Sequence, residues 1–114
     1  MTGGGAERAV AKLVELSADL RACALVGADG AVLASSADAP WAERTAELWA
    51  AADAARPGAG PATGVQVAVA GGEVFATREG GVTAVAVTDR FALASLMFCD
   101  LRAALRELES DRQG

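Results

Sequence analysis

An amphipathic helix is predicted near the start of the chain. Val10, Leu13, Val14 and Ser17 recur at the 3, 4, 7 spacing of one helix face, and the charged residues around them fall mostly on the other side. This spacing predicts a helix over residues 6–18 that buries one stripe of side chains.

A buried hairpin is predicted next. Residues 23–26 (Cys-Ala-Leu-Val) are apolar at every position, so a strand there should be covered on both faces. Asp29-Gly30 is a signal for a type I′ turn, because both residues tolerate positive φ. The turn leads into a second strand over residues 31–35.

A second helix is predicted over residues 40–55. Pro40 suits the first helical turn, where its missing N–H is no loss, and Asp38 is a candidate N-cap. The helix should end before Pro57, because the proline- and glycine-rich stretch 56–63 predicts a loop.

Three short strands should follow, over residues 65–70, 73–78 and 82–88. Gly71-Gly72 and Gly80-Gly81 separate them, and connections this short permit only hairpins. The three strands therefore form an antiparallel meander.

The strands of this meander alternate in side-chain size. Val65, Val67 and Val69 share one face of the first strand, with smaller or polar residues on the other, and the last strand repeats the alternation. One face of the sheet should therefore be bulky and the other small, and a helix can lie close to the small face.

A long amphipathic helix is predicted over residues 90–109, with Thr88 or Asp89 as its cap. Leu93 and Leu96 lie beside its apolar stripe. The stripe consists of Ala94, Met97, Phe98, Leu101, Leu105 and Leu108.

The element order α-β-β-α-β-β-β-α predicts an α/β protein of the α+β type, with one antiparallel sheet covered by helices. The 114 residues suit a single domain, which we expect over residues 6–109. The glycine-rich start (1–5) and the polar end (110–114) are expected to be flexible tails.

The ordered pattern resembles the roadblock (dynein light-chain roadblock) family. The matching features are the apolar strand 23–26, the Asp29-Gly30 hairpin, the small residues Ala34-Ser35 before a helix, the three-strand meander and the helix over 91–108. The resemblance implies a five-stranded sheet of order 2-1-5-4-3. It places the first and third helices on one face and the second helix on the other, over the alanine side.

The resemblance also implies a homodimer that pairs its third strands and packs its second helices together. The third strand is apolar and carries no Pro or Lys, so an exposed edge there would be open to pairing. The expected dimer interface comprises Leu48, Trp49, Val65, Gln66, Val67, Ala68 and Val69.

Trp41 and Trp49 are the only tryptophans, and both lie on one side of the second helix. They could belong to the core, or they could contact a partner, since Trp is enriched at binding hot spots. Trp41, Glu43, Arg44 and Glu47 are the candidate partner-binding residues.

Composition argues against several classes of function. The net charge of −5 and the scattered basic residues argue against nucleic acid binding. We find no apolar run long enough for a membrane span and no signal sequence, so a cytoplasmic protein is expected. Cys23 and Cys99 are expected to be free, buried thiols.

The sequence offers no catalytic, cofactor or metal site. Histidine and tyrosine are absent, which removes histidine-based catalysis and the commonest zinc ligand. The glycine pairs lack the spacing of a phosphate loop, and Asp29 is read as a turn residue. We expect a protein without enzymatic activity.

The expected function is that of a homodimeric binding module. The resemblance implies that it regulates or scaffolds a small Ras-like GTPase in bacterial signalling. The alternative is a ligand-sensing domain of the PAS or GAF type, which also combines an antiparallel sheet with helices.

Overall fold

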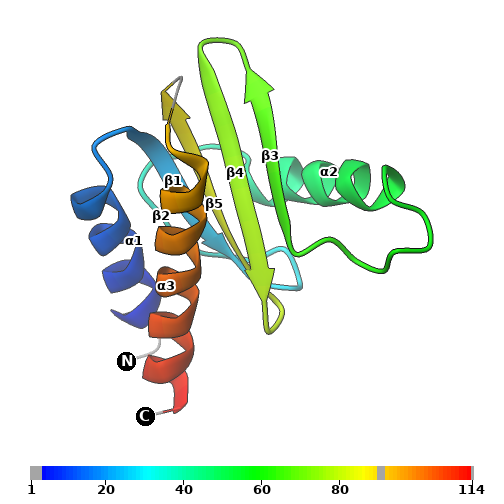
Figure 1. The fold of residues 1–114 in the computed structure, drawn as a ribbon. Coiled ribbons are helices and arrows are strands. Elements are labelled where there is room, and N and C mark those ends of the chain that lie inside the picture. Colours follow the sequence, from blue (N-terminus) through cyan, green and yellow to red (C-terminus); the bar gives the residue numbers. More distant parts are fainter. Residues whose placement is uncertain (1–3, 90–91, 114) are drawn as a thin grey trace.

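The computed structural model describes residues 4–89 and 92–113 of the chain. Three helices and five strands follow one another in the predicted order (Figure 1). They are α1 (Gly4–Leu16), β1 (Leu20–Val26), β2 (Val32–Ser35), α2 (Trp41–Ala54), β3 (Gly64–Val69), β4 (Gly72–Glu79), β5 (Val82–Asp89) and α3 (Ala94–Gln113).

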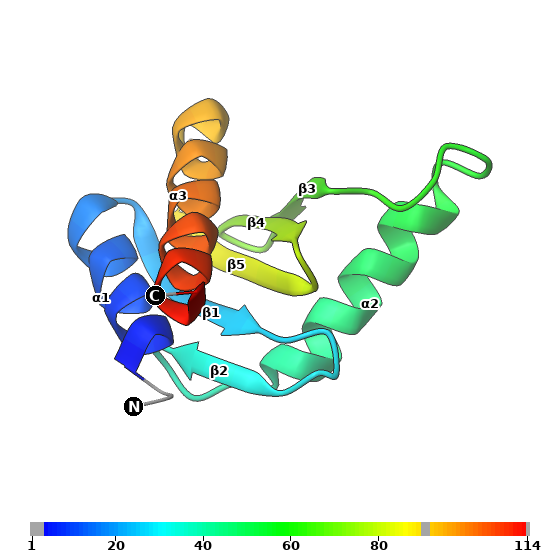
Figure 2. The ribbon, with the colours of Figure 1, turned by 90° about the horizontal axis from the view of Figure 1, so that it is seen from below.

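The five strands form one antiparallel sheet in the order β2-β1-β5-β4-β3. Helices α1 and α3 run side by side along one face of the sheet, and α2 crosses the opposite face (Figures 1 and 2). The α+β fold and the strand order confirm the prediction. β2 and β3 form the two outer strands of the sheet.

The larger core lies between the sheet and the pair α1 and α3. Leu13, Leu25, Phe75 and Leu101 are fully buried there. The ring of Phe75 meets that of Phe98 edge to face, with centroids 5.5 Å apart. Burial of each of these large side chains contributes roughly 1.5–3 kcal/mol to folding.

The alanine side of the sheet faces α1 and α3, contrary to the prediction that it lies under α2. Ala84 and Ala86 belong to the larger core, whereas Val85 packs with Trp41 and Trp49 on the α2 side. The reason is volume. Two helices carry leucine, methionine and phenylalanine side chains toward this face, and the small Ala84 and Ala86 of β5 leave room for them beside Leu25 and Phe75.

Three predicted helix caps were wrong, two of them because β5 extends further than its sequence predicts. β5 continues to Asp89, and Thr88 lies buried in it, so neither residue caps α3. The helix starts at Ala94, and residues 90 and 91 lie outside the described residues. No side-chain hydrogen bond caps α2, whose N-cap is Pro40 rather than Asp38.

The first hairpin has a three-residue loop instead of the two-residue type I′ turn. The Gly27 N–H donates to the Ala31 carbonyl across the loop, and Gly30 adopts a φ of 86°. The Asp29 carboxylate accepts a hydrogen bond from the Ala31 N–H, so this residue has the expected turn role. Three-residue loops that end in a left-handed glycine are common in hairpins.

Helix α1 includes Gly4 and Gly5, and α3 reaches Gln113, so both helices extend into the segments predicted to be tails. Among the residues expected on apolar helix faces, Val14 is half exposed. Leu93 and Leu96 are also exposed beside the buried stripe of α3. None of the described helices is long and apolar enough to cross a membrane.

The two cysteines differ in their surroundings. Cys23 is buried in β1, and burial raises the pKa of its thiol, whereas Cys99 is exposed. The prediction of two buried thiols is therefore wrong for Cys99. Its position two residues after Met97 turns it away from the stripe that α3 buries.

The backbone of β4 at Gly72 lies so close to β5 that no room remains for a side chain. A Cβ built on Gly72 would collide with the carbonyl oxygen of Thr88 on β5, whereas one on Gly64 would make an ordinary contact with the Phe98 ring at 3.5 Å. We expect Gly72→Ala to lower the free energy of unfolding by about 3 kcal/mol, at the upper end of overpacking costs. Gly64→Ala, the matched control, should change it by less than about 1 kcal/mol.

Urea unfolding of both variants at one protein concentration measures this difference. Equal stabilities of the two variants would show that the β4–β5 pairing can relax around an added methyl group.

Candidate protein interface

The β3 strand is an open edge of the sheet. It pairs with β4 through Gly64–Val69 and has no further strand on its other side among the described residues. The side chains of Val67 and Val69 are 38% and 42% exposed. Unpaired backbone groups beside exposed valines make a surface suited to pairing with another strand.

A groove separates α2 from the valine side of the sheet. Its volume is about 610 Å³, and most of its lining is apolar. Val67 and Val69 place one end of the groove at the β3 edge. The other lining residues are Ala22, Ala37, Ala39, Pro40, Trp41, Arg44, Thr45, Glu47, Leu48, Ala51, Val74, Val85 and Val87.

Six of the predicted interface residues line this groove. The expected dimer residues Leu48, Val67 and Val69 lie there together with the expected partner-binding residues Trp41, Arg44 and Glu47. The two sets, predicted as separate surfaces, are therefore neighbours in the structure.

The other predicted residues lie elsewhere. Val65 is half-buried against the core under α2, and Trp49 faces a second cavity. Gln66 and Ala68 are exposed on β3, where the Gln66 amide donates to the Glu73 carboxylate. Glu43 is exposed on α2, outside the groove lining.

Both tryptophans belong to the core of their own chain. Trp41 and Trp49 are only 5% and 6% exposed. The indole N–H of Trp41 donates to the Ala37 carbonyl at 2.8 Å, and that of Trp49 donates to the Thr83 hydroxyl at 3.0 Å. These bonds join both halves of α2 to its surroundings.

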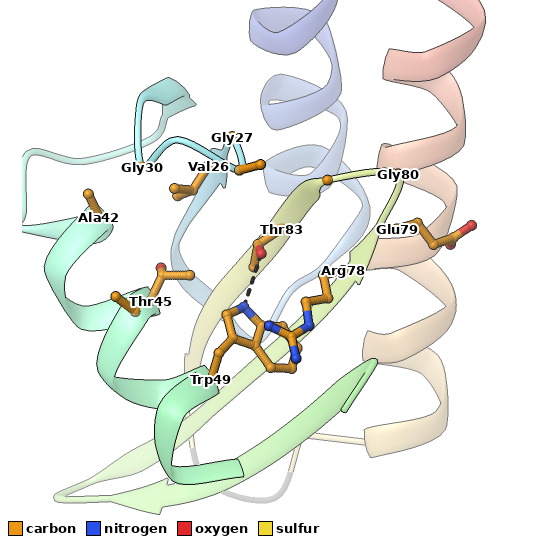
Figure 3. A pocket seen from close by; sticks show the side chains of 13 residues that line it. Val26, Gly27, Gly30, Ala42, Thr45, Trp49, Arg78, Glu79, Gly80 and Thr83 are labelled. Carbon is orange, nitrogen blue, oxygen red and sulfur yellow. Dashed lines mark hydrogen bonds between the residues drawn. The ribbon is translucent and has the colours of Figure 1, made fainter. Parts of the chain in front are cut away.

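An ion pair holds the C-terminal end of α2 to the sheet. Both carboxylate oxygens of Asp53 accept hydrogen bonds from Arg78 on β4, at 2.9 and 3.0 Å. The guanidinium carbon of Arg78 lies 4.0 Å from the centre of a Trp49 ring (Figure 3). The Ala62 N–H donates to Asp53, and the Ala62 carbonyl accepts from Arg78, so the loop after α2 is held as well.

These hydrogen bonds lower the pKa of Asp53. The bond from the Ala62 N–H contributes most, followed by the bond from Arg78. Local sequence patterns do not predict this pair, because the two residues lie 25 positions apart. A signal was nevertheless present, since Arg78 is the only basic residue between positions 64 and 89.

Several solved structures from bacteria have a similar fold. The Roadblock/LC7 domain from Streptomyces avermitilis superposes with a TM-score of 0.76 at 16% identity, over 95% of this chain and 98% of that one. The gliding protein MglB from Thermus thermophilus gives a TM-score of 0.73 at 20% identity, over 95% and 90%. This chain has the roadblock fold.

Myxococcus xanthus MglB also matches the roadblock fold, with a TM-score of 0.67 at 16% identity over 98% of this chain and 87% of that one. No family model matches the sequence, and no curated protein matches it. Identities this low carry the fold only, because one fold hosts many functions.

Among the described residues of this roadblock fold, no group of three His, Cys, Asp or Glu side chains could hold a metal ion. The candidate site is the groove and the β3 edge that opens into it. Its lining is apolar and its rim carries exposed charged residues, and protein interfaces likewise combine an apolar core with a polar rim.

The Asp53–Arg78 pair should make stability depend on pH. Because the folded state lowers the pKa of Asp53, its contribution is present above the unfolded pKa of about 3.9 and is lost as pH falls through the folded value. We expect Asp53→Asn to be less stable than the wild type at pH 7, with a difference that shrinks below about pH 4.

Urea unfolding at several pH values measures this difference. Glu43→Gln, which removes an exposed carboxylate from the same helix, is the control and should stay close to the wild type throughout. A pH-independent difference for Asp53→Asn would mean that the Asp53 charge does not stabilise the fold.

Proposed function

We propose that this chain is a homodimeric binding module that regulates or scaffolds a small Ras-like GTPase in the cytoplasm, without catalytic activity of its own. The observation that carries the proposal is the continuity between the open β3 edge and the apolar groove under α2. A second copy and a partner would use adjoining parts of this surface.

Pairing of two β3 strands is the proposed dimer contact. The strand has the sequence Gly-Val-Gln-Val-Ala-Val, with no Pro, Lys or other charged residue to discourage pairing. An antiparallel pair of β3 strands would satisfy their free backbone groups and join the two sheets. It would also bring the exposed Val67 and Val69 of both copies together.

Helix α2 supports the same arrangement. Its C-terminal end and the following loop extend past the β3 edge, away from their own sheet (Figure 2). A second copy joined at β3 would meet this projecting end. Exposed alanines on α2, such as Ala50, Ala51 and Ala54, would permit close approach of another helix.

A charge on the groove side of β3 should prevent dimerisation. Val67→Lys would place an ammonium group among apolar side chains at the pairing edge, so we expect monomer or aggregate. Val14→Lys is the matched control, because it makes the same change at a half-exposed valine of α1, on the opposite face of the sheet and away from β3. Light scattering at micromolar concentration should give about twice the chain mass of 11.4 kDa for the wild type and the control.

A stable wild-type mass near 11.4 kDa would contradict the dimer. If Val67→Lys dimerises as strongly as the wild type, the dimer contact does not lie at β3.

The GTPase partner follows from the roadblock resemblance, in which bacterial relatives are partners of small Ras-like GTPases. The exposed residues Glu43, Arg44 and Glu47 on α2 offer charged contacts for such a partner. None of the arginines near this surface is suited to act as an arginine finger. Arg44 lies inside α2, Arg56 follows its end, and Arg78 is held by Asp53.

The GTPase can be identified by a pull-down from native cytosol and then assayed by single-turnover hydrolysis. We expect Arg44→Ala and Arg56→Ala to leave the saturated rate within a few-fold, a change of roughly 1 kcal/mol or less. An arginine finger would be worth about 10³–10⁵-fold. Glu47→Arg should weaken binding of the GTPase.

Light scattering of Glu47→Arg provides the control, because Glu47 lies on the rim of the groove. Weaker GTPase binding with an intact dimer assigns Glu47 to the partner surface. If either arginine truncation abolishes hydrolysis while binding persists, the chain donates catalytic charge and the scaffold proposal fails.

A further inference from the structure

A second cavity lies on the other side of α2 from the groove. It has a volume of about 350 Å³, is open to solvent, and is bordered by α2, the β1–β2 loop and the β4–β5 turn (Figure 3). Exposed residues at its rim include Ala28, Glu79 and Gly80. No residue of β3 lines it, so it is separate from the proposed dimer contact.

The hydroxyl of Thr45 in this cavity has no hydrogen-bond partner among the described residues. The residue is 5% exposed, and its Oγ1 is buried. An unsatisfied buried hydroxyl destabilises the folded chain, because it has lost its hydrogen bonds to water. Figure 3 shows Thr45 on α2 beside the space that Val26 and Thr83 border.

Thr83 contributes a second hydroxyl, from β5. Its Oγ1 accepts the indole N–H of Trp49 at 3.0 Å, which leaves its own O–H hydrogen able to donate. The cavity thus offers one hydroxyl that can both donate and accept and another that can donate. Val26, Ala42 and Trp49 form apolar walls around them.

The charges around the cavity favour an uncharged ligand. Arg78 is the basic residue of the lining, and its guanidinium is already paired with Asp53. Glu79 adds a negative charge at the rim, which would repel an anion. A primary amide fits these groups, because its oxygen accepts from hydroxyls and its NH₂ group donates to Thr45.

We propose that this cavity is a binding site for a small molecule with a primary amide on a compact apolar body. The amide hydrogen-bonds with the hydroxyls of Thr45 and Thr83, and the apolar body packs against Val26 and Trp49. This site goes beyond the proposed binding module and does not depend on it. Thr45 also lines the groove, so the ligand would contact the helix that forms the protein interface.

Titration of ¹⁵N-labelled protein with isobutyramide, followed by NMR, tests the site. The amide signals of four lining glycines report on the cavity: Gly27, Gly30, Gly80 and Gly81. We expect these signals to shift saturably, with a dissociation constant in the millimolar range for so small a probe. Isobutyrate has the same apolar body with a charged carboxylate and should bind at least tenfold more weakly.

Two substitutions at one position separate a binding role from a packing role. Thr45→Val keeps the shape but removes the hydroxyl, and it should weaken isobutyramide binding at least tenfold. Thr45→Ser keeps the hydroxyl and should retain binding. Because the hydroxyl is unsatisfied in the free protein, Thr45→Val should be at least as stable as the wild type in urea.

Four outcomes would overturn the proposal. These are the absence of saturable shifts, equal binding by Thr45→Val, equal binding of isobutyrate, and a loss of stability in Thr45→Val that shows its hydroxyl to be satisfied within the chain. None of them bears on the β3 edge, so the dimer proposal is tested separately.

Discussion

Close packing of α1 and α3 against the alanine side of the sheet constrains the rest of this chain. Ala84 and Ala86 present only methyl groups, so large side chains from both helices reach the sheet and surround Phe75. This half of the molecule encloses most of the buried leucines. The opposite face of β5 must then carry Val85 and Val87, because successive residues of a strand alternate between faces.

The valine face receives α2 in a different way. Val74, Val85 and Val87 pack on this side together with Ala24 and Ala76, and polar contacts attach the helix as well. Trp41 bonds the preceding loop, Trp49 bonds Thr83, and Asp53 pairs with Arg78. Between these attachments, two cavities remain along the helix, with Thr45 lining both.

The two faces of the sheet differ in the size of their cores and in the surface that they leave open. The closely packed side contributes the larger core, and the cavity between α1 and α3, at about 230 Å³, is smaller than the groove at about 610 Å³. The α2 side has a smaller core, an apolar groove and an open strand edge. In the proposed dimer, binding of a second chain would cost little ordering of α2, because hydrogen bonds and an ion pair already attach this helix within its own chain.

Local spacing in the sequence was sufficient to predict the elements and their order. The helical stripes, the alternating valines and the Asp29-Gly30 hairpin each depend on residues a few positions apart, so a single sequence reveals them. The strand order and the division of helices between faces were expected from the resemblance to the roadblock family, and the structure has both. The alternation also showed that the side chains on the two faces of β3 and β5 differ in size.

The sequence did not reveal whether the alanine side or the valine side of the sheet packs against α2. The volumes that compete for the alanine side come from α1 and α3, which are far apart in the sequence, and their sum is not visible in any short segment. The Asp53–Arg78 pair depends on the same long-range packing, as do the exposure of Cys99 and the start of α3 beyond β5. Local patterns in the chain specify the elements and the alternation, whereas packing between distant segments forms the groove, because its walls come from α2 and four strands that meet only in the folded chain.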